Sequence, residues 1–352
     1  LNPETGVLLA KGLCERIGID GKFTYKPAGK EAVKDADVSM PTHSEAIQAV
    51  LNALVDKDNG VIGSMQEIDA VGHRVVHGGE AFAGSVLITD EVMKALEECI
   101  PLAPLHNPAN ITGINACTAV MGKDVPQVAV FDTAFHQTMP AKAYMYALPY
   151  EYYEKDKVRR YGFHGTSHKY VSGRAAAMLG KKPEELKLIS CHLGNGSSIA
   201  AVDGGKSVDT SMGFTPLAGL PMGTRCGSID PAIVPILMQK KGLDNAGMDK
   251  YMNKECGVLG ISGISSDFRD LVEAAAAGND HAQTTLEAYA YRVGKYIGAY
   301  AAELNGADAI CFTAGIGENS PVIRELICSP YLEHLGVELD KEANNIRGKE
   351  RI

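Results

Sequence analysis

The sequence has no run of eighteen apolar residues, no C-x-x-C pair and no excess of positive charge. Without such an apolar run, we expect no membrane-spanning helix and no membrane partner. The net charge of −9 argues against nucleic-acid binding, because that function is marked by a basic stripe or domain. Eight cysteines scattered over 352 residues predict reduced thiols in a cytoplasmic protein, not a disulfide framework.

Strand-like and helix-like segments alternate along the chain, which predicts an α/β protein. A length of 352 residues is enough for two domains, each with its own core. The tyrosine-, proline- and charge-rich stretch 137–160 lacks a clean period, and we interpret it as the crossover between the domains. The expected strands are 70–76, 127–131, Ala309–Thr313 and one entering the stretch 187–198. A hairpin is expected over 199–208, with Asp203-Gly204-Gly205 as its turn. The expected helices begin near Thr42, where Thr42 and Glu45 have the form of a capping box, near Asp90, after Thr166 and at about 282.

Two strands are each followed by a glycine-rich turn. The first reads KLISCHLGNGSS over 187–198, and the second reads AICFT followed by AGIGEN over 309–319. Backbone N–H groups of such turns bind phosphate oxygens, and glycine allows the ligand to come close. Asn195, Ser197 and Ser198 add neutral donors. A plain hairpin or helix-entry turn is the alternative for each one, but two together favour a nucleotide site.

The common nucleotide motifs are absent from both turns. Neither contains G-x-x-x-x-G-K-[ST], which excludes a P-loop ATPase. Neither contains G-x-G-x-x-G, which disfavours a dinucleotide site of the Rossmann type. The pattern therefore favours a phosphotransferase of another kind.

Seven of the ten histidines fall between positions 73 and 192, which raises the question of a metal site. His73 and His77 are spaced i, i+4, but that spacing shares one face only on a helix, and this stretch looks like a strand. His164 and His168 cross a predicted helix start and lack the glutamate of H-E-x-x-H. Zinc is the weaker hypothesis, and histidines that hydrogen-bond or stabilise negative charge are the better one.

Three charged residues stand in unusual surroundings. Arg74 lies in an apolar strand, and Arg225 lies among small residues in MGTRCGS. Such an arginine either pairs with a structural carboxylate or binds an anionic ligand. Asp132 follows an apolar strand, where it is either a site carboxylate or a cap.

These residues lie in stretches that resemble the acetokinase family, within the acetate and sugar kinase, Hsp70 and actin superfamily. The matches occur in family order over most of the chain. They are GHRVVHGGE (72–80), LAPLHN (102–107), FDTAFHQTMP (131–140), YGFHGTSHKY (161–170), HLGNGSS (192–198), SMGFTP (211–216), MGTRCGSIDP (222–231), SDFRDL (266–271) and FTAGIGENS (312–320).

The resemblance implies a two-lobed actin-like ATPase (ribonuclease H-like) fold, with duplicated sheet-plus-helix domains around a cleft. We expect an N-terminal lobe over 1–136, without its first strand and loop, and a C-terminal nucleotide-binding lobe over 137–352. The implied reaction is reversible transfer of the γ-phosphoryl of ATP to acetate, with Mg²⁺, in a homodimer. Propionate or butyrate is the alternative acceptor, because one methylene changes discrimination by only ~1–3 kcal/mol.

The resemblance also implies roles for individual residues. Arg74 would bind the acetate carboxylate, and His164 and Arg225 would stabilise the transferring phosphoryl. The methyl group of acetate would be enclosed by Val76, Leu105, Phe163 and Pro216. ATP would be bound by His192, Leu193, Gly194, Asn195, Gly196, Asp267, Phe268, Arg269, Gly315, Ile316, Gly317, Glu318 and Asn319.

Asp132 matches the family's catalytic acid, but a role as base is hard to justify. A carboxylic acid with a pKa near ~4.3 is already ionised at neutral pH. We therefore expect Asp132 to position Mg²⁺ or to orient Arg74.

The termini depart from the family pattern. Family members begin with a strand and an Asn-Ala-Gly-Ser-Ser-Ser loop, and end with a Mg²⁺-binding glutamate and a final helix. The sequence shows neither, so we expect a fragment of low activity. A non-enzymatic Hsp70- or actin-like nucleotide switch is the alternative from another class, and it would not need Asp132, Arg74 and Arg225 together.

Overall fold

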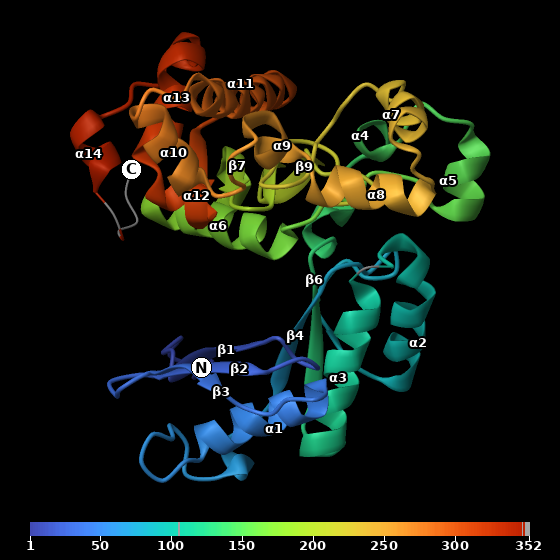
Figure 1. Ribbon diagram of the computed structural model, residues 1–352, viewed down its shortest axis with the longest axis vertical. Coiled ribbons are helices and arrows are strands. Elements are labelled where there is room, and N and C mark those ends of the chain that lie inside the picture. The colour runs from blue at the N-terminus through green and yellow to red at the C-terminus, as the bar shows by residue number, and fades with distance from the viewer. Residues whose placement is uncertain (105, 347, 349–352) are drawn as a thin grey trace. The chain divides into compact units, whose positions relative to one another are not determined.

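The computed structural model describes residues 1–104, 106–346 and 348. By their internal contacts these residues divide into two compact units. Unit 1 comprises Leu1–Gly78 and Ser85–Val130, and unit 2 comprises Gly79–Gly84 and Phe131–Ile352. Both contain sheets and helices, as the sequence predicts (Figure 1).

Unit 1 begins with an antiparallel three-stranded sheet in the order β1-β2-β3. Helix α1 (His43–Leu54) packs against it, and starts at the predicted capping box of Thr42 and Glu45. Phe23, Tyr25 and Ala46 form the centre of this core. The strands are β1 (Ala10–Glu15), β2 (Lys22–Pro27) and β3 (Val33–Asp37).

A second sheet of unit 1 has the order β4-β6-β5. Helix α3 packs against β4, and α1 and α2 pack against α3 (Figure 1). The elements are β4 (Val71–Val75), β5 (Val86–Leu87), α2 (Asp90–Glu98), α3 (Asn107–Met121) and β6 (Gln127–Phe131), with short 3₁₀ helices at Met65–Glu67 and Ile100–Leu102.

Unit 2 is organised around a four-stranded sheet in the order β10-β7-β8-β9. The β10–β7 pair is parallel, whereas β7–β8 and β8–β9 are antiparallel. The predicted turn Asp203-Gly204-Gly205 closes the β8–β9 hairpin, and both glycines have positive φ (57° and 75°). The strands are β7 (Lys187–Leu193), β8 (Ser197–Asp203), β9 (Lys206–Thr210) and β10 (Ala309–Thr313).

Alternate residues of the central strands face different helices. Ile189, Cys191 and Ile199 pack in one core with α11 and α13. Leu188 and Val202 pack on the opposite face with α6. Figure 1 shows β7 between these helices. Successive side chains of a strand point to opposite faces of the sheet, and both faces are buried here, so apolar residues occupy both sets of alternating positions.

Helices make up most of the rest of unit 2. The helix expected at 282–304 is α11, which spans Asp280–Glu303. The others are α4 (Ala141–Tyr144), α5 (Tyr150–Asp156), α6 (Gly165–Met178), α7 (Ile233–Lys241), α8 (Asn245–Lys254), α9 (Gly257–Ser262), α10 (Phe268–Ala276), α12 (Ala314–Asn319), α13 (Pro321–Tyr331) and α14 (Lys341–Asn345), with 3₁₀ turns at Ala134–Thr138, Pro183–Glu185 and Glu333–Leu335.

The boundary between the units differs from the expected 136/137. It follows Val130, and the stretch 137–160 lies inside unit 2. The segment Gly79–Gly84 also belongs to unit 2, because Phe82 stacks on Phe131 with ring centres 4.5 Å apart and Glu80 pairs with Arg159 at 2.7 Å. Among the described residues, none of the helices is long and apolar enough to cross a membrane.

Candidate functional site

The two glycine turns lie side by side at one edge of the unit 2 sheet. Strands β7 and β10 are parallel neighbours with His192 opposite Thr313, so their carboxyl ends meet there. A Cβ atom on Gly194 would lie 3.5 Å from Cβ of Ala314. The two glycine turns are therefore neighbours, and their binding of phosphate stays a prediction.

The sequence suggested a loop for the second turn, but the structure has the short helix α12 there. It starts directly after β10, with Ala314 at a positive φ of 64°. Gly317 packs toward β7, since its Cβ would lie 3.7 Å from Cβ of Leu193. Gly315 faces open space and is exposed. Ile316 is buried in the core, so a ligand would contact its backbone rather than its side chain.

Internal hydrogen bonds fix the first turn. Gly194 N–H donates to the carbonyl of Gly196 at 3.1 Å, and Ser197 Oγ donates to the carbonyl of Gly194 at 2.8 Å. Ser197 and Ser198 are fully buried and begin β8, which corrects their expected role as phosphate donors. Asn195, by contrast, is exposed at the tip.

The loop containing Arg225 packs directly on this turn. Gly223 N–H donates to the Asn195 carbonyl at 3.1 Å. A Cβ atom on Gly223 would overlap Asn195 Oδ1 and would lie 3.3 Å from the carbonyl oxygen of Ser266. Only glycine fits this approach. The turn at 194–196, the loop at 222–228 and the start of α10 are therefore brought together.

Arg225 is partly buried, and no carboxylate among the described residues forms an ion pair with it. Its side chain contacts Met222 Sδ at 3.8 Å. Burial lowers the pKa of its guanidinium below the ordinary value. The structure thus disfavours the alternative of a structural carboxylate partner, and leaves a desolvated cation suited to an anionic ligand.

His164 lies beside Arg225. A Cβ atom on Gly196 would lie 3.4 Å from His164 Nε2 and 3.7 Å from Arg225 Nη1, so glycine keeps the space between these two side chains and the turn open. His164 precedes α6 with a left-handed φ of 57°, which is uncommon for a side chain other than glycine. Such backbone strain is concentrated at functional sites.

Asp132 is held close to this histidine. It follows β6, its side chain is 2% exposed, and its carbonyl accepts a hydrogen bond from Gly165 N–H at 2.9 Å. Asp132, His164 and Arg225 therefore all lie in unit 2, near the turn at 194–196.

The clustered histidines are hydrogen-bonded to serines. His192 Nδ1 lies 2.8 Å from Ser167 Oγ, and the His192 ring stacks on His164 with centres 4.1 Å apart. His136 lies between Ser207 Oγ and the Phe163 carbonyl, at 2.7 and 2.9 Å. Within the described residues, no group of three histidine, cysteine, aspartate or glutamate side chains is arranged to bind a metal ion.

The segment 267–269 begins α10, with Asp267 as its cap. Arg269 donates hydrogen bonds to the Asp267 carboxylate, and these lower the pKa of that carboxyl to about 2. Phe268 is a core residue, packed on Tyr289 with ring centres 4.6 Å apart. Leu193 is likewise fully buried, so both could contact a ligand through their backbones alone.

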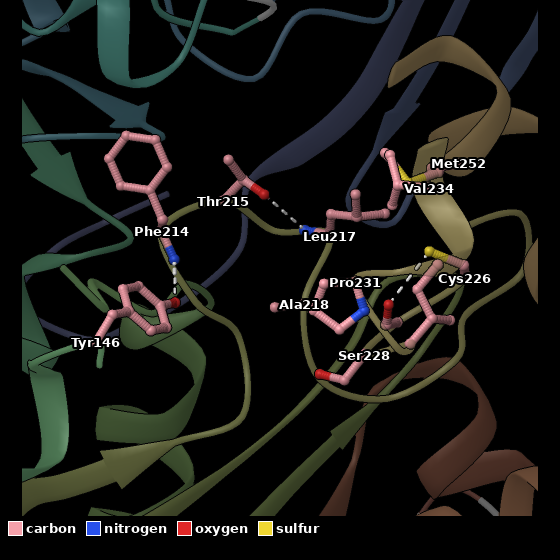
Figure 2. Close-up of a pocket in the computed structure, with 12 residues that line it drawn as sticks. Tyr146, Phe214, Thr215, Leu217, Ala218, Cys226, Ser228, Pro231, Val234 and Met252 are labelled. Atoms are coloured by element: carbon pink, nitrogen blue, oxygen red, sulfur yellow. Dashed lines mark hydrogen bonds between the residues drawn. The ribbon is translucent and has the colours of Figure 1, made fainter. Parts of the chain in front are cut away.

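Two residues expected to enclose a methyl group lie in unit 2. Phe163 is 2% exposed and Pro216 is partly buried. Next to Pro216, the chain forms a pocket of about 360 Å³ that the sequence did not reveal (Figure 2). Tyr146, whose hydroxyl accepts the Phe214 N–H at 2.9 Å, closes one side. The other lining residues are Thr215, Leu217, Ala218, Cys226, Gly227, Ser228, Ile229, Pro231, Val234 and Met252.

The remaining predicted residues belong to unit 1. Arg74 is exposed on β4. Val76 follows that strand, is 9% exposed, and donates its N–H to Asn110 Oδ1 at 3.0 Å. Leu105 lies outside the described residues.

Comparison with known proteins gives a family match over the whole chain. The model described as "Acetokinase family" matches residues 1–352. The acetate kinase of Natranaerobius thermophilus is 62% identical over 350 residues, covering 99% of this chain and 87% of that protein. The acetate kinase of Clostridioides difficile is also 62% identical, covering 98% and 86%.

Solved structures agree. The crystal structure of Porphyromonas gingivalis acetate kinase has a TM-score of 0.95 at 47% identity, covering 100% of this chain and 88% of that one. A propionate kinase from Francisella tularensis has a TM-score of 0.91 at 43% identity, covering 98% and 87%. The α/β, actin-like ATPase fold expected from the sequence is therefore confirmed.

Proposed function

The chain belongs to the acetokinase family, and on that premise we propose that it reversibly transfers the γ-phosphoryl of ATP to acetate, giving acetyl phosphate and ADP. The observation that carries the proposal is Arg225, a partly buried guanidinium without a carboxylate partner among the described residues. It lies beside His164 at a glycine turn, as a phosphoryl-binding cation should.

The nucleotide is assigned to the edge of the unit 2 sheet. The backbones of 192–196 and 315–319 and the start of α10 are proposed to contact it. Gly315 faces open space, and Gly196 keeps the space beside His164 and Arg225 open. Asn195, Glu318 and Asn319 are the exposed side chains of the two turns. This arrangement supports ATP or ADP as the bound nucleotide.

The proposed acetate site combines a cationic side chain for the carboxylate with apolar side chains for the methyl group. Arg74, exposed on β4, is proposed to bind the carboxylate. Phe163, Pro216 and Val76 are proposed to contact the methyl group, as is Leu105 on the strength of the family pattern.

The reaction makes limited demands on protein side chains. The transferring phosphoryl spreads its charge over equatorial oxygens, so positioned donors supply most of the catalysis. Arg225 and His164 are those donors in the proposal. Acetate is already ionised at neutral pH, because its acid has a pKa near ~4.3, so no general base is required.

Mg²⁺ fits the residues present as a substrate-bound ion. Protein sites for Mg²⁺ at phosphates commonly provide one or two carboxylates, the remaining ligands being phosphate oxygens and water. Asp132, buried next to the His164–Gly165 segment, is the carboxylate suited to this. When bound, the ion neutralises phosphate charge; Asp132 would hold it directly or through water, or would orient Arg74.

Propionate is the second candidate acceptor, since one structural neighbour is named a propionate kinase. A non-enzymatic nucleotide switch is disfavoured by the combination of Arg225 and the apolar side chains near it.

We also propose a homodimer in the cytoplasm. No side chain of helix α7 is fully buried within the chain, although its sequence is IVPILMQKK, and Ile236 is 61% exposed. Such an apolar helix surface is suited to a second copy. All eight cysteines are free, which is typical of a reducing compartment.

The function is tested by incubating the protein with ATP, Mg²⁺ and acetate in the presence of hydroxylamine. We expect acetate-dependent ADP release and an equal amount of acetohydroxamate. Propionate and butyrate in parallel reactions define the acceptor. ADP release that does not depend on the added carboxylic acid would indicate a non-enzymatic type of nucleotide switch. Absence of hydroxamate with all three acids would overturn the proposal.

A further inference from the structure

Two serines and one histidine form a continuous line of hydrogen bonds behind the His164 ring. His164 Nδ1 lies 2.8 Å from Ser198 Oγ, and that same oxygen lies 2.8 Å from His168 Nε2. His168 Nδ1 lies 2.9 Å from Ser190 Oγ. Ser190, His168 and Ser198 are each 0% exposed, so bulk water does not compete for these bonds.

The burial of Ser190 determines which group donates in each of these hydrogen bonds. Among the described residues, Ser190 Oγ has no hydrogen-bond partner other than His168 Nδ1. A buried hydroxyl that accepted from Nδ1 would leave its own hydrogen unsatisfied, which is costly. Ser190 therefore donates to His168 Nδ1.

The remaining directions follow from the chemistry of imidazole. A neutral ring carries one N–H, so a His168 that accepts at Nδ1 donates from Nε2 to Ser198. Ser198 then has its own hydrogen to give, and His164 Nδ1 is its acceptor. A neutral His164 must in consequence carry its hydrogen on Nε2.

We propose that His168 is a positioning residue for phosphoryl transfer, which through Ser198 keeps Nδ1 of His164 unprotonated and its hydrogen on Nε2. The inference rests on the function proposed above. His164 donates to the phosphoryl as a neutral imidazole, without first acquiring a second proton.

The Nε2–H tautomer is suited to binding the phosphoryl because of where Nε2 lies. That nitrogen lies on the edge of the ring next to Gly196 and Arg225 Nη1. With Nε2–H, both neighbouring side chains present donors to an anionic phosphoryl. With the opposite tautomer, a lone pair would face the same oxygens and repel them.

His168 keeps these donor and acceptor roles fixed because its ring remains neutral. Burial, with the neighbouring histidines, lowers the pKa of His168 well below its ordinary value. A ring that does not gain a second proton near neutral pH keeps one donor and one acceptor.

The tautomers can be measured directly on the unmodified protein. Histidine ¹⁵N NMR distinguishes protonated from unprotonated ring nitrogens, and Ser198→Ala and His168→Gln assign the signals. We expect Nε2–H and unprotonated Nδ1 for both His164 and His168 at neutral pH. A hydrogen on Nδ1 of either ring, including a doubly protonated His164, would overturn the proposal.

Kinetics test the consequence. Ser198→Ala removes the link, and we expect kcat to fall about tenfold or more while KM for acetate stays within about twofold, because a transition-state donor is weakened. Ser207→Ala is the matched control: its hydroxyl is equally buried and bonds His136, off the line. Equal losses in the two variants would show a purely structural role.

The two proposals fail in different ways. Absence of acetyl phosphate formation would overturn the proposed function, yet the NMR experiment would still determine the tautomers. Conversely, an active enzyme with Nδ1–H on His164 would retain the function and refute the role of His168.

Discussion

Gly165 donates its backbone N–H to the carbonyl oxygen of Asp132 at 2.9 Å, and a Cβ atom on that glycine would overlap the same oxygen. Asp132 directly follows β6, and Gly165 is the first residue of α6. The contact therefore fixes the start of the helix that carries His168 against the residue proposed to position Mg²⁺. His164, immediately before Gly165, is held in the same place.

We predict that Gly165→Ala separates these elements. The added methyl must displace the Asp132 carbonyl, so we expect a loss of ~1–3 kcal/mol in the free energy of unfolding and a clear fall in kcat. Urea unfolding and the hydroxamate assay measure the two effects. Gly173→Ala on the same helix is the control; its Cβ meets open space, and it should stabilise by ~0.5–1 kcal/mol. Equal behaviour of the variants would contradict the prediction.

Arg225 and Arg160 should respond oppositely to replacement by methionine. Arg225 has no carboxylate partner among the described residues, so Arg225→Met should leave the stability of the ligand-free protein unchanged or higher while lowering kcat about a thousandfold. Arg160 donates to the Thr210 carbonyl at 2.7 Å and lies 3.6 Å from Asp209. Arg160→Met should destabilise by ~1–3 kcal/mol. A marked loss of stability in Arg225→Met would indicate a structural arginine.

Local patterns in the sequence predicted the elements well. Thr42 and Glu45 predicted the start of α1, and the glycines at 204 and 205 predicted the turn of the β8–β9 hairpin. Both predictions were possible because caps and tight turns depend on a few adjacent residues. The site carboxylate Asp132 and cation Arg225 were also visible, as charges in apolar or small-residue surroundings. Their proximity to Gly196 depended on the fold, and resemblance to the family was needed to predict it.

The sequence-based predictions failed at positions whose structure depends on contacts between residues far apart in the chain. We interpreted GNGSS as one turn whose serines add donors, yet Ser197 and Ser198 pair in register with β7 and their side chains are buried. Nothing in the local sequence shows that Phe82 stacks on Phe131, which moves Gly79–Gly84 into unit 2. The line from Ser190 to His164 joins residues from two strands and one helix, so spacing could not reveal it.

Stability should fall in mild acid because histidines are buried. Burial lowers the pKa of His136 to about 4, against an ordinary 6.5. As pH falls from about 6.5 toward 4, the unfolded chain binds a proton that the folded chain does not. Stability is thus fully present above that window and is lost through it, by ~1.4 kcal/mol per pH unit for each such histidine.

Replacing His136 should flatten that dependence. We expect the slope of unfolding free energy against pH to be smaller in His136→Phe by about one histidine's share, whatever its stability at neutral pH. Urea unfolding followed across the window measures it. His43→Phe, at the exposed start of α1, should keep the original slope. An unchanged slope in His136→Phe would mean that this ring does not titrate on unfolding.

The α7 surface should control association. Ile236→Glu places a charge on the exposed apolar side of the helix, and we expect a monomer where the unmodified protein is a dimer, with little change in secondary structure. Light scattering coupled to gel filtration reports the mass. Val322→Glu on α13, at a residue 40% exposed, is the control and should stay dimeric. Dimers of both variants would place the interface elsewhere.

Asp132→Asn separates the positioning role from that of a base. Acetate needs no deprotonation at neutral pH, so we expect the loss of the carboxylate charge to raise the Mg²⁺ concentration needed for half-maximal rate and to lower kcat about a hundredfold or more. Titrating Mg²⁺ at saturating ATP and acetate separates these effects, and the pH–rate profile should keep its shape. If Arg74 orientation is the dominant role, KM for acetate rises while the Mg²⁺ dependence stays unchanged. Near-normal turnover with an unchanged Mg²⁺ dependence and an unchanged KM would refute both roles.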